Sequence, residues 1–216
     1  MKENSSRVPI EPAGKAARAV FTRLASAFFL TVLLAACATQ RVPGLPPLSD
    51  WETRQAVLAV HPEWSFSGSI GVRAGTEGFN GHIRWHQVDN GFSATVSGPL
   101  GAGSIALSGD GQQITIIDKT GEAIELVDAE EDLRSMYGWT IPVGSLRYWA
   151  LGIPDPANPA STEFGDDGQL RHIEQRNWSV DISEYREVGG ELMPRRIVAV
   201  NGDAKVTVFI RRRTFF

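Results

Sequence analysis

The sequence predicts a mainly β protein in which about ten short antiparallel strands curl into a half-closed barrel, with two or three helices against its open side. Three observations lead to this prediction. From Trp64 onward, apolar and polar residues alternate with a period of two, as in strands with one buried face. The runs are short and bounded by turn segments such as "DNG" and "SGDGQ". A strongly twisted sheet of about this size curls instead of staying flat.

The first strands show the alternation most clearly. Trp64, Phe66 and Ile70 share one parity, while serines occupy the other. Later runs that repeat the pattern lie at 79–86, 92–96, 105–107, 114–116, 124–126, 178–182 and 206–210. Short strands at this spacing predict an antiparallel meander with one dry face and one solvated face.

Helices interrupt the meander. Asp128, with Glu131 three residues later, forms a capping box and predicts a helix that ends near Tyr137. A second helix is expected to follow Pro142 and end at Gly152, because the proline two residues further on prevents its continuation. An earlier helix is expected over about 49–60.

The dry face of the predicted sheet is unusually aromatic. Its large rings are Trp64, Phe66, Phe79, Trp85, Phe92 and Trp178. Each ring fits ordinary core packing. As a set they also fit an incompletely filled interior that admits an apolar ligand, and the pattern alone leaves both interpretations open.

The first 36 residues have the organisation of a secretory signal. Residues 1–23 carry five basic and two acidic side chains, and the thirteen residues Leu24–Ala36 are uncharged. An apolar stretch of this length is too short for a permanent membrane span. A basic segment, a short apolar segment and small residues at its end are typical of a signal peptide.

The predicted signal ends in "LAAC", which resembles the lipobox of bacterial lipoproteins. Cys37 is the only cysteine of the chain, and in that class it becomes the lipidated first residue of the mature protein. Ala38 follows it, and in this class a residue other than Asp there indicates export to the outer membrane. We therefore expect a signal peptide over 1–36, a lipidated N-terminus and tether over 37–49, and one domain over 50–216.

The charge of the mature chain argues against nucleic acid as a partner. Loss of residues 1–36 removes five basic and two acidic side chains and changes the formal net charge from −4 to −7. Phosphate binding requires clustered Lys and Arg. The basic residues Arg195, Arg196 and 211–213 fit contact with anionic headgroups or a protein partner, and they fit ordinary solvated strand charge equally well.

Motifs for catalysis, metals and nucleotides are weak. His82 and His86 are separated by about 13 Å on a strand, too far to hold one ion. The stretch "GPLGAGS" lacks the lysine of a phosphate-binding loop, and 166–168 lacks further oxygen ligands at calcium-loop spacing. A Ser/His/Asp set in a motif context is also absent. We expect no cofactor, no metal and no enzyme activity.

The segment Gly138–Pro154, "GWTIPVGSLRYWALGIP", resembles the LolB family of bacterial outer-membrane lipoprotein receptors. Further matches occur in order along the chain: Trp85 in "RWHQ", Gly98–Gly101 as "GPLG", Asp128–Glu131 as "DAEE", "NWSV", and the later Tyr185. The chain departs from the family at its end. A tryptophan is expected there, and Phe215 or Phe216 is expected to take its place in "RRRTFF".

This resemblance implies an open, incomplete antiparallel β-barrel of about ten or eleven strands, with helices forming a lid over a hydrophobic cavity. It implies a lipid-anchored, periplasm-facing protein of the Gram-negative outer membrane that accepts acylated lipoproteins from the periplasmic carrier LolA and inserts them into the membrane. The implied partners are LolA, the lipoprotein cargo and outer-membrane phospholipid, and the chain is expected to be a monomer.

The resemblance also implies roles for individual residues. Cys37 is the lipid anchor, and Pro99 and Leu100 belong to a loop that inserts into the membrane. The acyl cavity is expected to be lined by Phe66, Trp85, Phe92, Trp139, Trp149 and Trp178. An apolar residue at a Gly- and Pro-rich loop tip either packs into the core or contacts an apolar surface outside, and the resemblance favours the second for Leu100.

Two other functions remain open at this point. A scaffold lipoprotein of an outer-membrane assembly complex predicts a filled core and a flat protein-binding face. A lipid hydrolase predicts a nucleophile and a base in contact within the interior.

Overall fold

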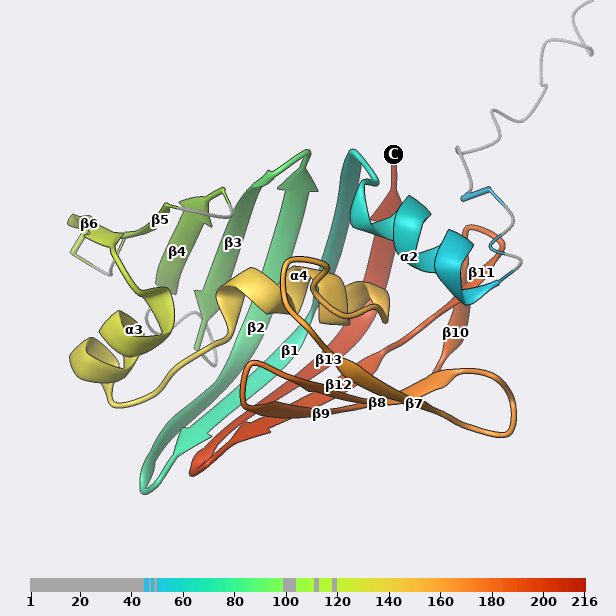
Figure 1. The fold of residues 1–216 in the computed structure, drawn as a ribbon. Helices are drawn as coiled ribbons and strands as arrows, with labels where there is room; N and C mark the ends of the chain where they lie inside the picture. Colours follow the sequence, from blue (N-terminus) through green and yellow to red (C-terminus); the bar gives the residue numbers. More distant parts are fainter. Residues whose placement is uncertain (1–44, 47, 49, 99–103, 111–112, 118–119) are drawn as a thin grey trace, which may run out of the picture. The chain divides into compact units, whose positions relative to one another are not determined.

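The computed structural model describes residues 45–46, 48, 50–98, 104–110, 113–117 and 120–216 (Figure 1). The described residues all belong to one compact unit. They confirm the mainly β prediction: one open antiparallel sheet contains eleven strands, three helices accompany it, and a separate hairpin contains two strands.

The bounds of the elements agree closely with the strongest sequence patterns. The helices are α2 (Trp51–Ala59), α3 (Ala129–Tyr137) and α4 (Val143–Leu151). The strands of the large sheet are β1 (Glu63–Ala74), β2 (Glu77–Val88), β3 (Gly91–Ser97), β4 (Ser104–Gly109), β5 (Ile114–Ile117), β6 (Ala123–Leu126), β7 (Ser161–Phe164), β8 (Leu170–Gln175), β9 (Trp178–Ser183), β12 (Arg196–Asn201) and β13 (Ala204–Phe215). The hairpin consists of β10 (Arg186–Val188) and β11 (Glu191–Met193).

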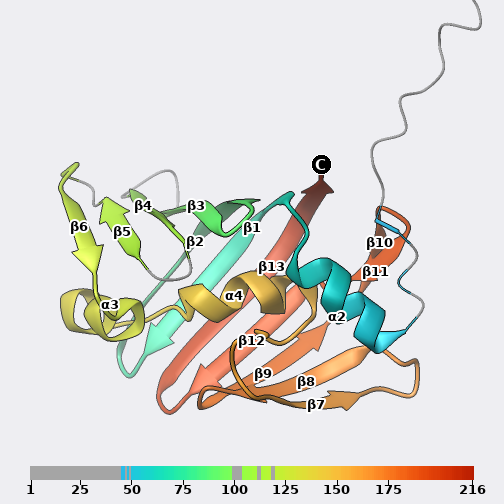
Figure 2. The ribbon, with the colours of Figure 1, turned by 45° about the horizontal axis from the view of Figure 1, so that its top comes forward.

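The sheet is open because its two edge strands do not pair with each other. The strand order is β6-β5-β4-β3-β2-β1-β13-β12-β9-β8-β7, so β6 and β7 are the edges. The chain passes from one edge to the other through α3 and α4. Figures 1 and 2 show α4 lying across one face of the sheet, with α2 beside it. The prediction of helices against the open side is therefore confirmed.

The central strand β1 defines the two faces of the sheet. Its even-numbered residues, including Trp64, Phe66 and Ile70, are buried, and its odd-numbered residues are more exposed. We call the buried side, covered by the helices, the inner face, and the opposite side the outer face. Burial of one parity fixes the register, because a one-residue slip would turn every apolar side chain outward.

A bulge interrupts the pairing of β1 with β13. Ser67 pairs with Arg212 and Gly68 with Ile210, which leaves Arg211 as the extra residue. A Cβ at Gly68 would lie 1.9 Å from the backbone oxygen of Phe209. Only glycine permits this close approach of the two strands.

The predicted helix at 128–137 is confirmed, but its capping differs in one detail. The Asp128 side chain accepts hydrogen bonds from the backbone N–H groups of Glu130 and Glu131, both at 3.1 Å. The reciprocal acceptor for the backbone N–H of Asp128 is Asp132, at 3.0 Å, and not Glu131. Asp132 also accepts from the backbone N–H of Val127. The carboxylate of Asp132 therefore satisfies two backbone donors just before the helix, those of Val127 and Asp128.

The other two helices begin and end where the sequence predicted. Helix α4 follows Pro142 and ends at Gly152, which has the left-handed conformation with φ +73°. Helix α2 is capped by Asp50, whose carboxylate accepts from the backbone N–H of Thr53 at 2.8 Å. None of the helices described in the structure is long and apolar enough to cross a membrane.

Candidate functional site

Four aromatic rings form a row across the inner face of β1, β2 and β3. Phe66 stacks between Trp64 and Trp85, with centroid distances of 6.0 and 6.1 Å and interplanar angles of 15° and 7°. Trp85 stacks on Phe92 at 4.5 Å and 8°. The rings follow one another because each faces inward at neighbouring register positions; Phe66, for example, pairs directly with Trp85. The structure thus brings together three of the six residues predicted to line an acyl cavity.

A buried glutamine satisfies the polar edge of this row. The indole Nε1 of Trp85 donates to Oε1 of Gln87 at 3.2 Å, and Nε2 of Gln87 donates to the backbone oxygen of Asp89 at 2.9 Å. Gln87 occupies an inward position of β2 and is only 2 % exposed. Its polar side chain on the buried parity was a signal in the sequence that we did not use. The row is therefore apolar on its faces and polar only at its rim.

A second aromatic pair ties α4 to β9. Trp149 and Trp178 lie edge to face with centroids 6.2 Å apart. Nε1 of Trp149 donates to Oε1 of Gln175 at 3.0 Å. Gln175 also accepts from the backbone N–H of Asp155 and donates to the backbone oxygens of Asp155 and Asn158. All four hydrogen-bonding positions of this buried amide are used.

Glu130 connects α3 to the same region. Its carboxylate accepts from Nε1 of Trp178 at 3.0 Å and lies 3.0 Å from Nη1 of Arg176. Trp178 is fully buried, so its indole N–H needs this acceptor. Each helix of the connection is therefore attached to the sheet by one tryptophan hydrogen bond. Trp149 of α4 donates to Gln175 of β8, and Trp178 of β9 donates to Glu130 of α3.

Trp139 lies apart from the other predicted lining residues. It contacts Phe79 with a centroid distance of 4.7 Å and stacks on Tyr137 at 5.4 Å. It belongs to the short segment between α3 and α4 and lies over the start of β2. The six predicted residues thus fall into three groups: the row on β1–β3, the Trp149–Trp178 pair, and Trp139.

An arginine reaches the inner face just beyond the bulge. Arg213 pairs with Phe66 in the sheet, and its guanidinium donates to the backbone oxygen of Ala150 near the end of α4. Its Nε is buried without a partner. Burial, and then the nearby Arg54 cation, hold the pKa of Arg213 well below its ordinary value. Arg213 is therefore largely buried, unlike the solvent-exposed strand residue that the basic run 211–213 also allowed.

Arg54 and Tyr185 complete the polar cluster around Arg213. Arg54 donates to the backbone oxygen of Leu192 at 2.7 Å and lies 3.8 Å from Glu191 across the β10–β11 hairpin. The Tyr185 hydroxyl donates to the backbone oxygen of Leu170 at 2.6 Å. Burial raises the pKa of Tyr185 to about 12, so it remains a neutral donor.

Side chains fill the inner face at the aromatic row, whereas a pocket of about 260 Å³ lies where the starts of α3 and α4 meet Ile114 and Leu126 of β5 and β6. The predicted lining residues are at most 9 % exposed. Where α2 and α4 meet the aromatic row, next to Leu58, Trp64 and Leu151, a pocket of only about 10 Å³ remains. That is roughly the space of one water molecule. An acyl chain at the aromatic row therefore requires the helices to move away from the sheet.

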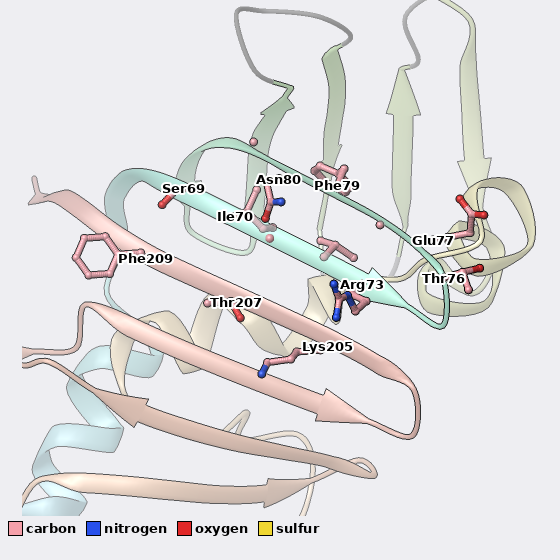
Figure 3. A pocket seen from close by; sticks show the side chains of 14 residues that line it. Ser69, Ile70, Arg73, Thr76, Glu77, Phe79, Asn80, Lys205, Thr207 and Phe209 are labelled. Carbon is pink, nitrogen blue, oxygen red and sulfur yellow. The ribbon is translucent and has the colours of Figure 1, made fainter.

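A larger hollow lies on the other side of the sheet. This groove of about 610 Å³ is lined by residues of β1, β2 and β13, among them Ser69, Asn80 and Thr207. Figure 3 shows it on the face of β1 and β13 turned away from the helices. The sequence patterns did not point to this groove, because small outward residues on a strand carry no distinctive signal.

Three predicted site residues lie outside the described part of the chain: Cys37, Pro99 and Leu100. The loop that contains Pro99 and Leu100 starts from β3 and ends at β4, where Ser97 pairs with Ser104. Among the described residues, no group of three or more His, Cys, Asp or Glu side chains is placed to hold a metal ion. His172 instead contacts Asp181 at 2.9 Å and Glu174 at 2.8 Å.

Comparison with known proteins identifies the family. The sequence profile of the family described as "Outer membrane lipoprotein LolB" matches residues 62–212. Similar proteins are the "Outer-membrane lipoprotein LolB" of Nitrosococcus oceani, 32 % identical over 178 residues, and that of Cellvibrio japonicus, 30 % identical over 183 residues. These alignments cover 81 % and 82 % of this chain and 89 % of each relative.

Among solved structures, a LolA superfamily protein from Nitrosomonas europaea is similar, with 9 % identity and a TM-score of 0.48, covering 72 % of this chain and 87 % of that one. The family match extends from the turn before β1 into the last strand, and so includes the aromatic row, both tryptophans of the second pair and the helical connection. The chain belongs to the LolB family of outer-membrane lipoproteins.

Proposed function

We propose that this chain accepts acylated lipoproteins from the periplasmic carrier LolA and inserts them into the outer membrane, holding their acyl chains between the inner face of its sheet and its helices. As a LolB-family member it is an outer-membrane lipoprotein receptor of the lipoprotein localisation system. The role proposed here requires transfer of a bound lipid anchor, with no covalent bond made or broken in the cargo.

One observation carries the proposal. The aromatic inner face is covered by α2 and by α3 and α4, and the last two belong to the single connection between the two open edges of the sheet. Helices α3 and α4 can move away without unpairing any strand, because they contribute no hydrogen bonds to the sheet ladder. A sheet that stays intact while its cover moves is a suitable device for opening an apolar interior.

The energy of the cargo explains why such an interior is needed. Three acyl chains of about 15 methylenes, at about 0.8 kcal/mol each, make release into water unfavourable by about 35 kcal/mol. Free diffusion of the cargo across an aqueous compartment is thereby excluded. The acyl chains must pass directly from one apolar interior to the next, and then into the bilayer.

We assign the acyl-contacting role to the predicted lining residues of the aromatic row, and a role in the cover to the other three. Phe66, Trp85 and Phe92 offer a continuous aromatic surface, so an acyl chain that replaces α4 there keeps most of the apolar contact that the helix loses. Trp149 and Trp178 would anchor the moving cover, and Trp139 would lie at its hinge between α3 and α4. Opening therefore replaces the apolar contact between α4 and the aromatic row by contact between an acyl chain and the same row, so little apolar contact is lost.

The anchor and the loop complete the proposed mechanism. We propose that residues 1–36 are removed, that Cys37 carries the lipid, and that 37–49 is a tether to the domain at 50–216. Leu100, next to Pro99, would contact the bilayer. Burial of one leucine contributes only about 1.5–3 kcal/mol, which is small beside a lipid anchor. Its proposed task is local: to open a path for cargo between the interior and the lipid.

A scaffold lipoprotein is the second candidate, and one observation favours it. The interior is packed at the aromatic row, as a scaffold requires. Membership of a receptor family weighs against it, and so does the placing of four aromatic rings under movable helices. The two candidates differ in whether cargo ever enters the interior.

Cargo acceptance tests the proposal directly. LolA loaded with a fluorescent lipoprotein would be mixed with the tagged chain starting at Ala38, and the cargo recovered with each protein would be measured. The proposal expects cargo to move to the tagged chain, and expects a non-acylated version of the same cargo not to move. Recovery of all cargo with LolA would favour the scaffold.

A further inference from the structure

The outer face of the sheet is built from small side chains with isolated basic residues between them. On β1, the outward residues Ser65, Ser67, Ser69 and Gly71 are small, and β3 and β4 continue the pattern with Ser93, Thr95, Ser97, Ser104, Ala106 and Ser108. A face of this kind presents many hydroxyl groups and few obstacles. It can approach another flat surface closely.

The central strands β1, β2, β12 and β13 carry an excess of positive charge on this face, whereas Glu174 and Asp181 lie on the same face of β8 and β9. The exposed basic residues on the central strands are Arg73, Arg84, Arg196, Lys205 and Arg212. None of these five forms an ion pair within the residues that the structure describes. The acidic residues on these strands are Glu63, which lies 3.1 Å from His86, and Glu77 at the far end. The whole chain is acidic, with a net charge of −4, so this local excess is a segregation of charge.

The basic residues are placed as unfavourable neighbours. Arg73 pairs directly with Lys205, and Ser67 is flanked by Arg84 on one side and Arg212 on the other. Like charges at directly opposite positions of a sheet destabilise it. An anionic partner on this face would remove that repulsion.

The groove of about 610 Å³ lies among these charges. Two cations, Arg73 and Lys205, and one carboxylate, Glu77, line it. Asn80, Thr207 and Ser69 supply polar atoms along its length (Figure 3). Phe209 forms a wall, with the guanidinium of Arg195 4.6 Å from its ring centroid. The groove therefore combines hydrogen-bond donors, positive charge and a restricted apolar surface, which suits a charged headgroup better than an acyl chain.

The dimensions favour a planar partner over a single small anion. Ser67 and Arg73 are six residues apart on β1, which corresponds to about 20 Å. At Ser67 the flanking basic residues, Arg84 and Arg212, lie on the two neighbouring strands, about 10 Å apart across β1, and at Arg73 the basic neighbour is Lys205 on β13. Charges spread over such an area are too far apart to converge on one phosphate, but match a layer of anionic headgroups.

The length of chain before the domain permits this contact. Leu45 is buried in the core, and the backbone N–H of Leu48 donates to Glu191 at 3.0 Å, so the chain is already attached to the domain there. If Cys37 is lipidated, as the proposed function has it, the residues 38–44 before Leu45 reach at most about 25 Å. The lipid anchor then keeps the domain close to the membrane surface. Electrostatic attraction between a basic surface and anionic lipids acts only within about 10 Å of the membrane, so a tethered domain can use it where a free one would not.

We propose that the outer face of β1, β2, β12 and β13 docks on anionic phospholipid headgroups of the membrane in which the chain is anchored. The docking rests on the lipid anchor of the proposed function, and it orients the domain, leaving the helix-covered inner face free to receive cargo. The expected headgroups are phosphodiesters with net negative charge, such as phosphatidylglycerol.

A single-cysteine probe tests this contact in the mature lipidated chain. Cys37 is consumed by its lipid, so Ser69→Cys provides the one free thiol in the groove. Ser161→Cys, exposed on edge strand β7, is the matched control. Each chain would be incorporated into vesicles of phosphatidylcholine alone or with about one third phosphatidylglycerol, and the rate of reaction with a water-soluble maleimide would be measured.

The proposal expects phosphatidylglycerol to slow the reaction of Ser69→Cys several-fold and to leave Ser161→Cys unchanged. About 1 M salt should restore the rate, because the screening length falls to about 3 Å. Adding Arg73→Gln or Lys205→Gln should weaken the protection about fivefold for each charge removed. These exposed residues have no ion pairs to lose, so the variants are expected to fold.

Three results would overturn the proposal. Equal rates in both vesicles would show no contact with anionic lipid. Protection in neutral vesicles that resists salt would indicate contact between protein surfaces, and protection that requires LolA would indicate an acidic protein partner. Cargo transfer measured on the same vesicles separates the two claims, since intact transfer without protection refutes the docking alone.

Discussion

The side-chain oxygen of Gln175 accepts a hydrogen bond from Nε1 of Trp149 at 3.0 Å, and this bond joins the middle of the helical cover to strand β8. The same oxygen accepts from the backbone N–H of Asp155 at 2.9 Å, just after the end of α4. One amide thus holds both the helix and the chain that leaves it. The position of α4 over the sheet depends on this buried group.

Replacing Gln175 by leucine is expected to lower the free energy of unfolding by about 2–4 kcal/mol, because two buried donors lose their acceptor. Denaturant unfolding of the two proteins measures the difference. Gln169→Leu is the matched control, since the Gln169 side chain lies in a partly exposed turn, and its expected change is within about 0.5 kcal/mol. Equal effects of the two substitutions would contradict the role assigned to Gln175.

A glycine pair tests the bulge between β1 and β13. Gly68→Ala is expected to cost about 3 kcal/mol or more, because its Cβ would lie 1.9 Å from the backbone oxygen of Phe209. Gly144→Ala makes the same chemical change on the exposed side of α4, where no atom lies within 4 Å of the new Cβ. It is expected to raise the stability by about 0.5–1 kcal/mol. Thermal unfolding of both variants would reveal opposite shifts; a stable Gly68→Ala protein would be incompatible with the bulge as described.

The sequence predicted the parts of the fold in which local pattern and tertiary burial agree. Strands β1 to β3 alternate because one face packs against the helices, and α3 and α4 carry their own capping residues. Strand β12 was missed since Val198 and Val200 face outward beside inward Ile197 and Ala199, which hides the period of two.

Arg213 shows a second reason why the sequence pattern did not predict part of the site. Its direction depends on the bulge at Arg211, which shifts the parity of the strand after Ile210. A bulge is decided by the approach of a partner strand distant in sequence. The candidate site was predicted as a set of aromatic residues, but their division into a row, a pair and the separate Trp139 depends on register and on the path of the helices, which the local pattern does not contain.

His172 predicts a pH dependence of stability. Its hydrogen bonds to Asp181 and Glu174 raise the pKa of the imidazole above its ordinary value. The folded state therefore binds a proton more tightly than the unfolded state, and the stabilisation is fully present below pH 6.5 and lost as the pH rises through the raised pKa. Solvent screens the pair, so the effect is expected to be below about 1 kcal/mol.

Urea unfolding at pH 6 and pH 8.5 would measure this effect. Wild type should exceed His172→Gln in stability at pH 6, and the difference should shrink at pH 8.5. A difference that grows with pH would contradict the assigned partners of His172.

Trp85 tests the assignment of the aromatic row as an acyl-binding surface. A cargo with bromine atoms in its acyl chains is expected to quench tryptophan fluorescence, and Trp85→Phe is expected to remove a major part of that quenching while the stack on Phe92 remains. Trp51→Phe is the control, because Trp51 packs against Phe164 away from the row. Greater loss of quenching in Trp51→Phe would place the acyl chains elsewhere.

Delivery of cargo to a membrane tests the central claim most directly. LolA loaded with a lipoprotein would be mixed with liposomes and the chain starting at Ala38, either as wild type, as Leu100→Glu or as the apolar control Leu100→Met. The account predicts that wild type and Leu100→Met move cargo into the liposomes, whereas Leu100→Glu takes cargo from LolA and retains it. Failure of every version to take cargo from LolA would contradict the proposed receptor function.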